Sequence, residues 1–197
     1  MKYKFIVLLI FCILFSCDEK NENSTKYTIL KEQDRASLKE ELLEDRFTNL
    51  LPELMDKANI DMWLLISREY NEDPILKTML PATWLNARRR TIIIFYRNKE
   101  KNTLERLAVA RYDIGKSIKS AWDKEKEPNQ WKALAEIIKQ RNPERIGINM
   151  SKHFALADGL VKTDYDELVE NLPIELSDKL ISAEKLGITW IETRTKK

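Results

Sequence analysis

The stretch Thr91-Ile92-Ile93-Ile94-Phe95-Tyr96 is the strongest strand-forming segment of this 197-residue chain. All six of its residues are β-branched or aromatic, and such residues favour the pleated surface of a sheet. A polar turn over 98–102 follows, and a second strand-like run extends from Leu104 to Ala110. Two runs joined by a short polar turn predict an antiparallel hairpin over residues 91–110.

Helix and strand signals alternate on both sides of this hairpin. Upstream, a capping box at Ser37 opens a helix that Pro52 kinks and Asn59 ends, and a strand over 60–66 follows. Residues 67–88 are largely irregular, with one short helix. Downstream we expect a loop with a helical turn over 111–128, a helix over 129–140, a strand over 145–149, a helix over 167–171 capped by residues 163–166, a strand over 180–182 and a last helix over 183–194.

The order α-β-β-β-α-β-α-β-α predicts the fold class. It favours a three-layer α/β domain in which a mixed sheet, containing the antiparallel hairpin, has helices on both faces. The folded part is assigned to residues 33–197, a length that suffices for one domain with its own core.

The N-terminus has the features of an export signal. Lys2 and Lys4 precede the apolar run 6–15, which is too short to span a bilayer and has the length of a signal-peptide core. Ser16-Cys17 resembles the end of a bacterial lipobox, so residues 1–16 are predicted to be a lipoprotein signal peptide and Cys17 the lipidation site. An uncleaved N-terminal anchor is the alternative.

Residues 17–32 are predicted to be a disordered tether, because the tract 18–26 has no apolar residue to bury. The expected location is therefore the cell envelope, on a membrane through the lipid anchor. The domain faces either the periplasm or the cell surface, and the sequence leaves both open.

Composition excludes several function classes. The chain has 34 basic and 32 acidic residues, and removal of residues 1–16 takes away two lysines and no acid. The resulting balance near zero gives no electrostatic basis for nucleic-acid binding. The only cysteines are Cys12 and Cys17, so no disulfide is expected in the mature domain, and the four glycines form no phosphate-binding loop.

The residues also argue against a catalytic centre within this chain. A metal site needs several converging His, Cys, Asp or Glu side chains, and a nucleophile needs a neighbouring base. The chain has one histidine, His153, in a polar stretch. We therefore expect no catalytic residue, no metal ligand and no cofactor in this chain.

The best candidates for a cleft or an interface lie just before the strongest strand. Three consecutive arginines there could bind phosphate or carboxylate groups, or they could anchor the acidic segment 69–73. One tryptophan of the preceding irregular loop is a candidate wall of a cleft, whereas Trp63 and Trp131 fit the core. The predicted cleft or interface residues are Trp84, Arg88, Arg89, Arg90, Glu69 and Tyr70.

Four stretches, taken in order, resemble the N-terminal domain of Xaa-Pro aminopeptidase and creatinase-type metallopeptidases. With the opening helix they extend over residues 33–197. They are Asp61-Met62-Trp63-Leu64-Leu65-Ile66-Ser67-Arg68-Glu69-Tyr70-Asn71-Glu72-Asp73-Pro74, Arg111-Tyr112-Asp113-Ile114-Gly115, Arg145-Ile146-Gly147-Ile148-Asn149-Met150-Ser151 with Ala157-Asp158-Gly159-Leu160, and Trp190-Ile191-Glu192-Thr193-Arg194. The resemblance implies a ribonuclease-H-like α/β fold without catalytic metals.

In that family a downstream domain holds two divalent metals, often manganese, cobalt or zinc, on two aspartates, one histidine and two glutamates. None of these five ligands has a matching position in this chain. The resemblance therefore implies part of a metallo-aminopeptidase that is no enzyme by itself. The alternatives are a fragment of a longer product, a stand-alone descendant, or a chain completed by a second polypeptide.

The resemblance further implies an accessory role in the substrate cleft or in oligomerisation, centred on loops 67–90 and 111–128. The partners it implies are a second copy of the chain or the missing catalytic domain, besides the membrane. The alternative function is an independent envelope lipoprotein that binds a peptide, a protein or a small ligand. A self-sufficient hydrolase is the least favoured hypothesis.

Overall fold

The computed structural model describes residues 29–195, and from Glu32 onward these residues form one compact unit. The predicted signal peptide 1–16, the lipidation site Cys17 and most of the predicted tether 17–32 lie outside the described residues. No helix within 29–195 combines the length and the apolar character that crossing a membrane requires.

A six-stranded mixed sheet forms the middle layer. Its strands lie in the order β4-β3-β2-β1-β5-β6. The hairpin partners β2 and β3 are antiparallel, as predicted, and β2 is also antiparallel to β1, whereas β5 is parallel to β1 and to β6, and β4 is parallel to β3. The strands are β1 (Met62–Arg68), β2 (Arg90–Asn98), β3 (Thr103–Val109), β4 (Lys119–Ser120), β5 (Ile146–Ile148) and β6 (Leu180–Ser182).

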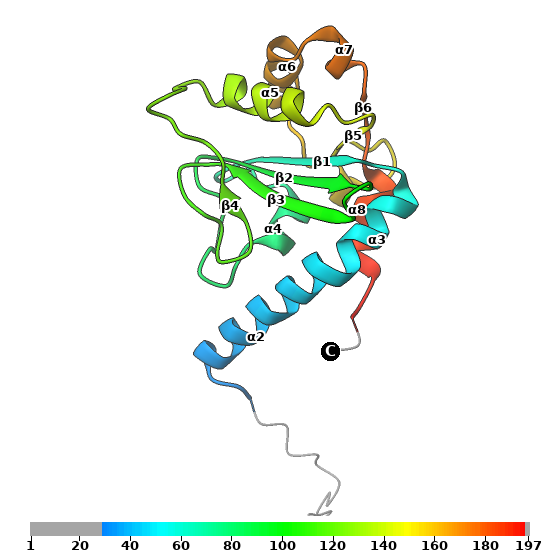
Figure 1. Cartoon of the computed structure of the whole chain (residues 1–197). Coiled ribbons are helices and arrows are strands. Elements are labelled where there is room, and N and C mark those ends of the chain that lie inside the picture. The colour runs from blue at the N-terminus through cyan, green and yellow to red at the C-terminus, as the bar shows by residue number, and fades with distance from the viewer. Residues whose placement is uncertain (1–28, 196–197) are drawn as a thin grey trace, which may run out of the picture. The chain divides into compact units, whose positions relative to one another are not determined.

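Helices cover both faces of this sheet (Figure 1). The helices α5, α6 and α7 lie on one face, and α2, α3, α4 and α8 lie on the other, which confirms the predicted three-layer α/β class. Their bounds are α2 (Glu32–Asp45), a π-helical turn (Arg46–Leu50), α3 (Leu51–Ala58), α4 (Pro74–Met79), α5 (Gln130–Arg141), a 3-10 turn (Ala155–Ala157), α6 (Lys162–Asn171), α7 (Ile174–Ser177) and α8 (Glu184–Glu192).

The central strand β1 separates two hydrophobic cores. Because successive side chains of a strand point to opposite faces, Trp63 and Leu65 enter the core under α3, α4 and α8, whereas Met62 and Leu64 enter the core under α5 and α6. All four side chains are buried. Each such burial contributes about 1.5–3 kcal/mol, so the sheet is held from both sides.

The N-terminal helix differs from its prediction. It begins at Glu32, five residues before the predicted cap, so Ser37 lies within the helix and no capping box forms there. Glu32 and Asp34 occupy the first turn, where negative side chains favour the helix N-terminus. The helix was expected to kink at Pro52, but its irregular part is the π-helical turn just before that residue. Pro52 itself lies in the first turn of α3, where a proline is well tolerated because a backbone N–H is not needed there.

At other element boundaries, some local sequence signals predicted the helix end correctly and others did not. Asn59 ends α3 with φ 52°, as the predicted stop requires, and Asn129 caps α5 by accepting two backbone N–H bonds. The helix predicted to begin at Glu167 begins at Lys162 instead, because Asp164 is buried in its first turn against arginines from the sheet. The segment 111–128 contains the expected helical turn and also the edge strand β4, which was not predicted.

Candidate functional site

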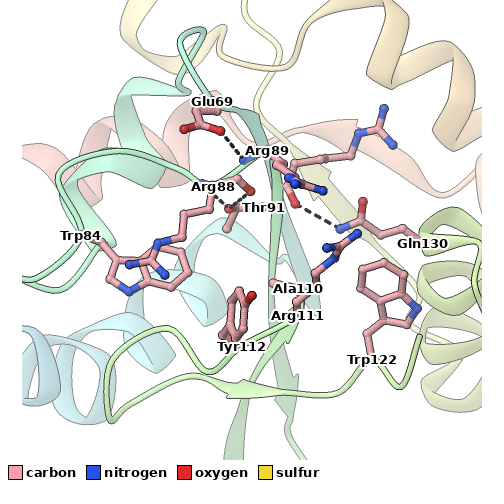
Figure 2. A pocket seen from close by; sticks show the side chains of 11 residues that line it. Glu69, Trp84, Arg88, Arg89, Thr91, Ala110, Arg111, Tyr112, Trp122 and Gln130 are labelled. Carbon is pink, nitrogen blue, oxygen red and sulfur yellow. Dashed lines mark hydrogen bonds between the residues drawn. The ribbon is translucent and has the colours of Figure 1, made fainter. Parts of the chain in front are cut away.

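A pocket of about 440 Å³ opens at the edge of the sheet where β1 and β3 end and β2 begins. The antiparallel register brings these three chain segments to the same edge. Figure 2 shows the lining side chains, and we call this cavity the arginine pocket. Its lining residues are Glu69, Trp84, Arg88, Arg89, Arg90, Thr91, Ala110, Arg111, Tyr112, Trp122 and Gln130.

Trp84 and Arg88 form one wall of the arginine pocket. The guanidinium of Arg88 lies over the indole of Trp84, 4.3 Å from its centroid. The indole is 9% exposed and reaches the core, whereas the arginine side chain is exposed. Stacking on an aromatic face orients a guanidinium and leaves its N–H groups free for a ligand.

Arg89 lies just before β2 and is hydrogen-bonded to the loop that follows β1. Its backbone has φ 52°, a left-handed conformation that is uncommon for a residue with a long side chain. Two bonds hold it there: the Glu69 N–H donates to the Arg89 carbonyl at 2.6 Å, and the Arg89 N–H donates to the Glu69 carboxylate at 3.1 Å. Glu69 therefore holds the backbone of Arg89, a constraint that leaves its guanidinium for other contacts.

Arg90 forms the base of the site, where it shares a buried carboxylate with Arg68. Asp164, whose side chain is 1% exposed, lies 2.7 Å from an Arg68 nitrogen and 3.1 Å from Arg90 Nε. The hydrogen bonds to Asp164 raise the pKa of Arg68. The Nε–H of Arg90 is not aligned with that carboxylate and has no hydrogen-bond partner in the described structure, while its guanidinium lies over Trp131. Because two arginines share one carboxylate, this cluster carries one excess positive charge.

The opposite wall comes from the segment after β3 and from the start of α5. Trp122 donates its indole N–H to the Glu127 carbonyl at 2.7 Å, which fixes the ring. The Gln130 side chain donates to the carbonyls of Val109 at 2.5 Å and Arg90 at 3.2 Å, tying α5 to both strands. In Figure 2, Trp122 and Gln130 face the Trp84 side across the pocket, with Arg111 and Tyr112 between them.

The charges of the pocket are unbalanced. Its lining has four arginines and one acid, and that acid already accepts a backbone N–H bond. Within residues 29–195 the side chains of Arg88, Arg89 and Arg111 have no carboxylate within 4.0 Å. Guanidinium groups bind carboxylate and phosphate in bidentate geometry, so the arrangement favours a ligand with an anionic group.

Five of the six residues predicted for a cleft meet in the arginine pocket: Trp84, Arg88, Arg89, Arg90 and Glu69. Tyr70 does not line it and is 86% exposed. The alternative role of the three arginines was to anchor the acidic segment 69–73. The Arg89 backbone N–H does bond the Glu69 carboxylate, whereas the Arg90 side chain pairs with Asp164 instead. Their ligand-binding role stays a prediction.

Four polar or aromatic lining residues were not predicted individually: Arg111, Tyr112, Trp122 and Gln130. A signal for the first two was present, since a hairpin over 91–110 places residues just after 110 beside residues just before 91. Trp122 is an aromatic residue in a polar segment, which was a weaker signal. Gln130 had none, because an amide at the start of a helix is ordinary.

No metal centre is evident in the part of the chain that the structure describes. Within 29–195 no three His, Cys, Asp or Glu side chains converge as ligands. His153 is an exposed loop residue that borders a second cavity, also about 440 Å³, at the carboxyl ends of β5 and β6.

The chain can be compared with protein families, curated proteins and solved structures. No protein-family model matches the sequence, and no curated protein matches it. Among solved structures, the chain is similar to an Xaa-Pro dipeptidase from Bacillus anthracis, with 17% sequence identity and a TM-score of 0.43. The match extends over 82% of this chain and 37% of the dipeptidase, so this chain spans little more than a third of that protein's length.

Proposed function

We propose that this chain is a ligand-binding accessory domain of an Xaa-Pro aminopeptidase-like metallopeptidase, without catalytic residues of its own. The observation that carries the proposal is the arginine pocket. Loops 67–90 and 111–128, which the sequence resemblance associates with the substrate cleft, each supply one wall of that pocket. A pocket of this size with aromatic walls and a few polar groups suits a short peptide segment.

The aromatic lining supports a peptide in particular. Tyr112 and Trp122 provide apolar surface beside the largely buried Trp84, while Arg88 and Arg111 provide donors. Proline-containing peptides have a rigid, apolar ring that loses little conformational freedom on binding, and such peptides dock to aromatic-lined grooves. The domain would thus hold part of a peptide substrate whose scissile bond lies in a separate catalytic domain.

Titration of the full chain with Xaa-Pro peptides of three to eight residues tests this proposal. We expect a saturable change in tryptophan fluorescence, because two of the indoles line the pocket, with a dissociation constant of about 10⁻⁴ M. Trp122→Phe should reduce the signal and Arg145→Gln should not, because Arg145 is exposed and outside the pocket. Absence of saturable binding by every peptide contradicts the proposal.

The accessory role has its own test. The pure chain supplied with Mn²⁺, Co²⁺ or Zn²⁺ should release no N-terminal residue from an Xaa-Pro peptide, and release at an enzymatic rate would contradict a non-catalytic role. The coding sequence of a metal-binding catalytic domain should lie in the DNA that follows the codon of Lys197. If no frame there encodes one, the single-gene version of the proposal fails.

An independent envelope lipoprotein is the second candidate, and the pocket also supports it. With this candidate we propose a signal peptide, a lipid anchor at Cys17, a location on a membrane and a homo-oligomeric assembly. Peptide binding together with no catalytic domain encoded by the same organism would favour this candidate. Metabolic labelling of the full-length protein with a tagged fatty acid, compared with Cys17→Ser, tests the anchor.

A further inference from the structure

We propose that the arginine pocket recognises the free C-terminal carboxylate of a peptide, held by the guanidinium group of Arg88 on the Trp84 wall, while Arg111 adds positive charge from the Gln130 side (Figure 2). This inference rests on the proposed function, since it names the part of the peptide that the pocket would hold. It also requires the apolar side chain next to that carboxylate to lie against the aromatic walls.

The excess of positive charge is the first step of the argument. Arg88 and Arg111 are exposed, and no carboxylate of residues 29–195 lies within 4.0 Å of either side chain. The lining carboxylate of Glu69 is engaged with the Arg89 backbone. Two guanidinium groups beside one cavity, with no internal counterion, match an incoming anion better than a neutral group.

The rigidity of the pocket is the second step. The Arg88 guanidinium is stacked on Trp84, and that indole is packed into the core. Arg88 is also fixed at its backbone, where its N–H and its carbonyl both bond the Thr91 hydroxyl, at 3.1 and 3.3 Å. A donor that is already oriented loses little entropy when it binds a ligand, which strengthens recognition of a planar carboxylate.

The combination of charge and aromatic surface distinguishes a chain terminus from other anions. Trp84, Tyr112 and Trp122 line the cavity beside the arginines. A peptide C-terminus has one carboxylate directly joined to a residue with an apolar side chain or a proline ring. Inorganic phosphate lacks the apolar part. The terminal carboxylate satisfies both features of the pocket.

Matched peptides separate these sources of negative charge. The full chain is titrated with acetyl-Ala-Ala-Pro-Phe as the free acid, with the same peptide as the C-terminal amide, and with an amide in which one alanine is replaced by glutamate. Inorganic phosphate is a fourth probe. We expect the free acid to bind about tenfold more tightly than either amide, a difference that shrinks from 0.05 to 0.5 M NaCl because salt screens exposed charges.

Arginine variants connect this preference to the pocket. Arg88→Gln should bring the free acid close to the affinity of the amide and Arg111→Gln should reduce the preference in part, while Arg145→Gln keeps the full preference. All three side chains are exposed, so folding should be unchanged, which far-ultraviolet circular dichroism and thermal unfolding will check.

The outcomes distinguish the two proposals. Equal binding of acid and amide, or a preference that survives both pocket variants, overturns the carboxylate inference and leaves peptide binding intact. Equal binding of the acid and the glutamate-containing amide assigns an acidic side chain instead, which also overturns it. Phosphate that binds as tightly as the free acid overturns it as well. Failure of every peptide overturns the proposed function itself.

Discussion

Asp73 shows at the scale of one residue how this fold accommodates a buried carboxylate. Its side chain caps α4 by accepting the N–H groups of Ile75 and Leu76, each at 2.8 Å. It also accepts a bond from the Asn149 amide at 2.8 Å, and Asn149 in turn accepts the Trp63 indole N–H. Burial raises the pKa of Asp73, and the three hydrogen bonds oppose that effect in part.

This raised pKa predicts a pH-dependent stability. An acid with a higher pKa in the folded state holds its proton more tightly there, so the stability it contributes is present below its unfolded pKa of about 4 and is lost as pH rises through the folded pKa. The unfolding free energy of the wild type minus that of Asp73→Asn should therefore fall between pH 4 and pH 7, as measured by urea denaturation.

Exposed Asp178 supplies the control for this prediction, since the structure gives its side chain no hydrogen bond or ion pair. The same difference taken with Asp178→Asn measures the background effect of removing an exposed carboxylate. A difference for Asp73→Asn that rises with pH would show that the hydrogen bonds outweigh burial.

At the scale of elements, one carboxylate joins helix α6 to two strands. Asp164 lies in the first turn of α6 and pairs with Arg68 at the end of β1 and with Arg90 at the start of β2. Negative charge is favoured at a helix N-terminus, so the same residue serves the helix and the sheet edge. Because Arg90 also lines the arginine pocket, this cluster supports the base of the proposed site.

Asp164→Asn should destabilise the protein by about 1–3 kcal/mol, because it leaves two guanidinium groups without their counterion while both keep some access to water. Asp166→Asn is the matched control: it lies on the same helix, in an exposed pair with Lys162, and should change stability little. Chemical denaturation measures both variants. Equal effects of the two changes would show that the cluster contributes no more than a surface ion pair.

At the scale of the whole described unit, the first and last helices are joined by Arg46. This side chain extends from the π-helical turn and donates to the carbonyls of Trp190 and Thr193 at the end of α8, at 2.6 Å for Thr193. Its guanidinium also lies 4.1 Å from the centroid of the Trp190 ring. The free carbonyls at a helix C-terminus favour such a positive partner.

Arg46→Ala should lower the unfolding free energy by about 2 kcal/mol, because it removes charged hydrogen bonds and an aromatic contact together. Arg35→Ala on the exposed part of α2 is the control and should be close to neutral. A denaturation midpoint for Arg46→Ala that matches the control would show that the two helices are held by the Phe47–Trp190 packing alone.

Much of the element order could be predicted from the chain, whereas element starts were less reliable. The run 91–96 is β-branched and aromatic, and Asn59 and Asn129 are typical of helix ends, so these local signals were sufficient. Residue types alone did not indicate that α6 starts at Lys162, since Asp164 acquires its role only when two strands bring arginines to it.

The sequence by itself determined the layered α/β class and singled out the arginines beside β2, because propensity and periodicity depend on neighbours along the chain. Only the tertiary structure decided which residues share the arginine pocket. Ile92 pairs with Val109, and this register brings Arg90, the first residue of β2, and Arg111, which follows β3, to one edge of the sheet. Long-range strand pairing and helix packing bring these residues together, and no local sequence pattern indicates that they will be neighbours.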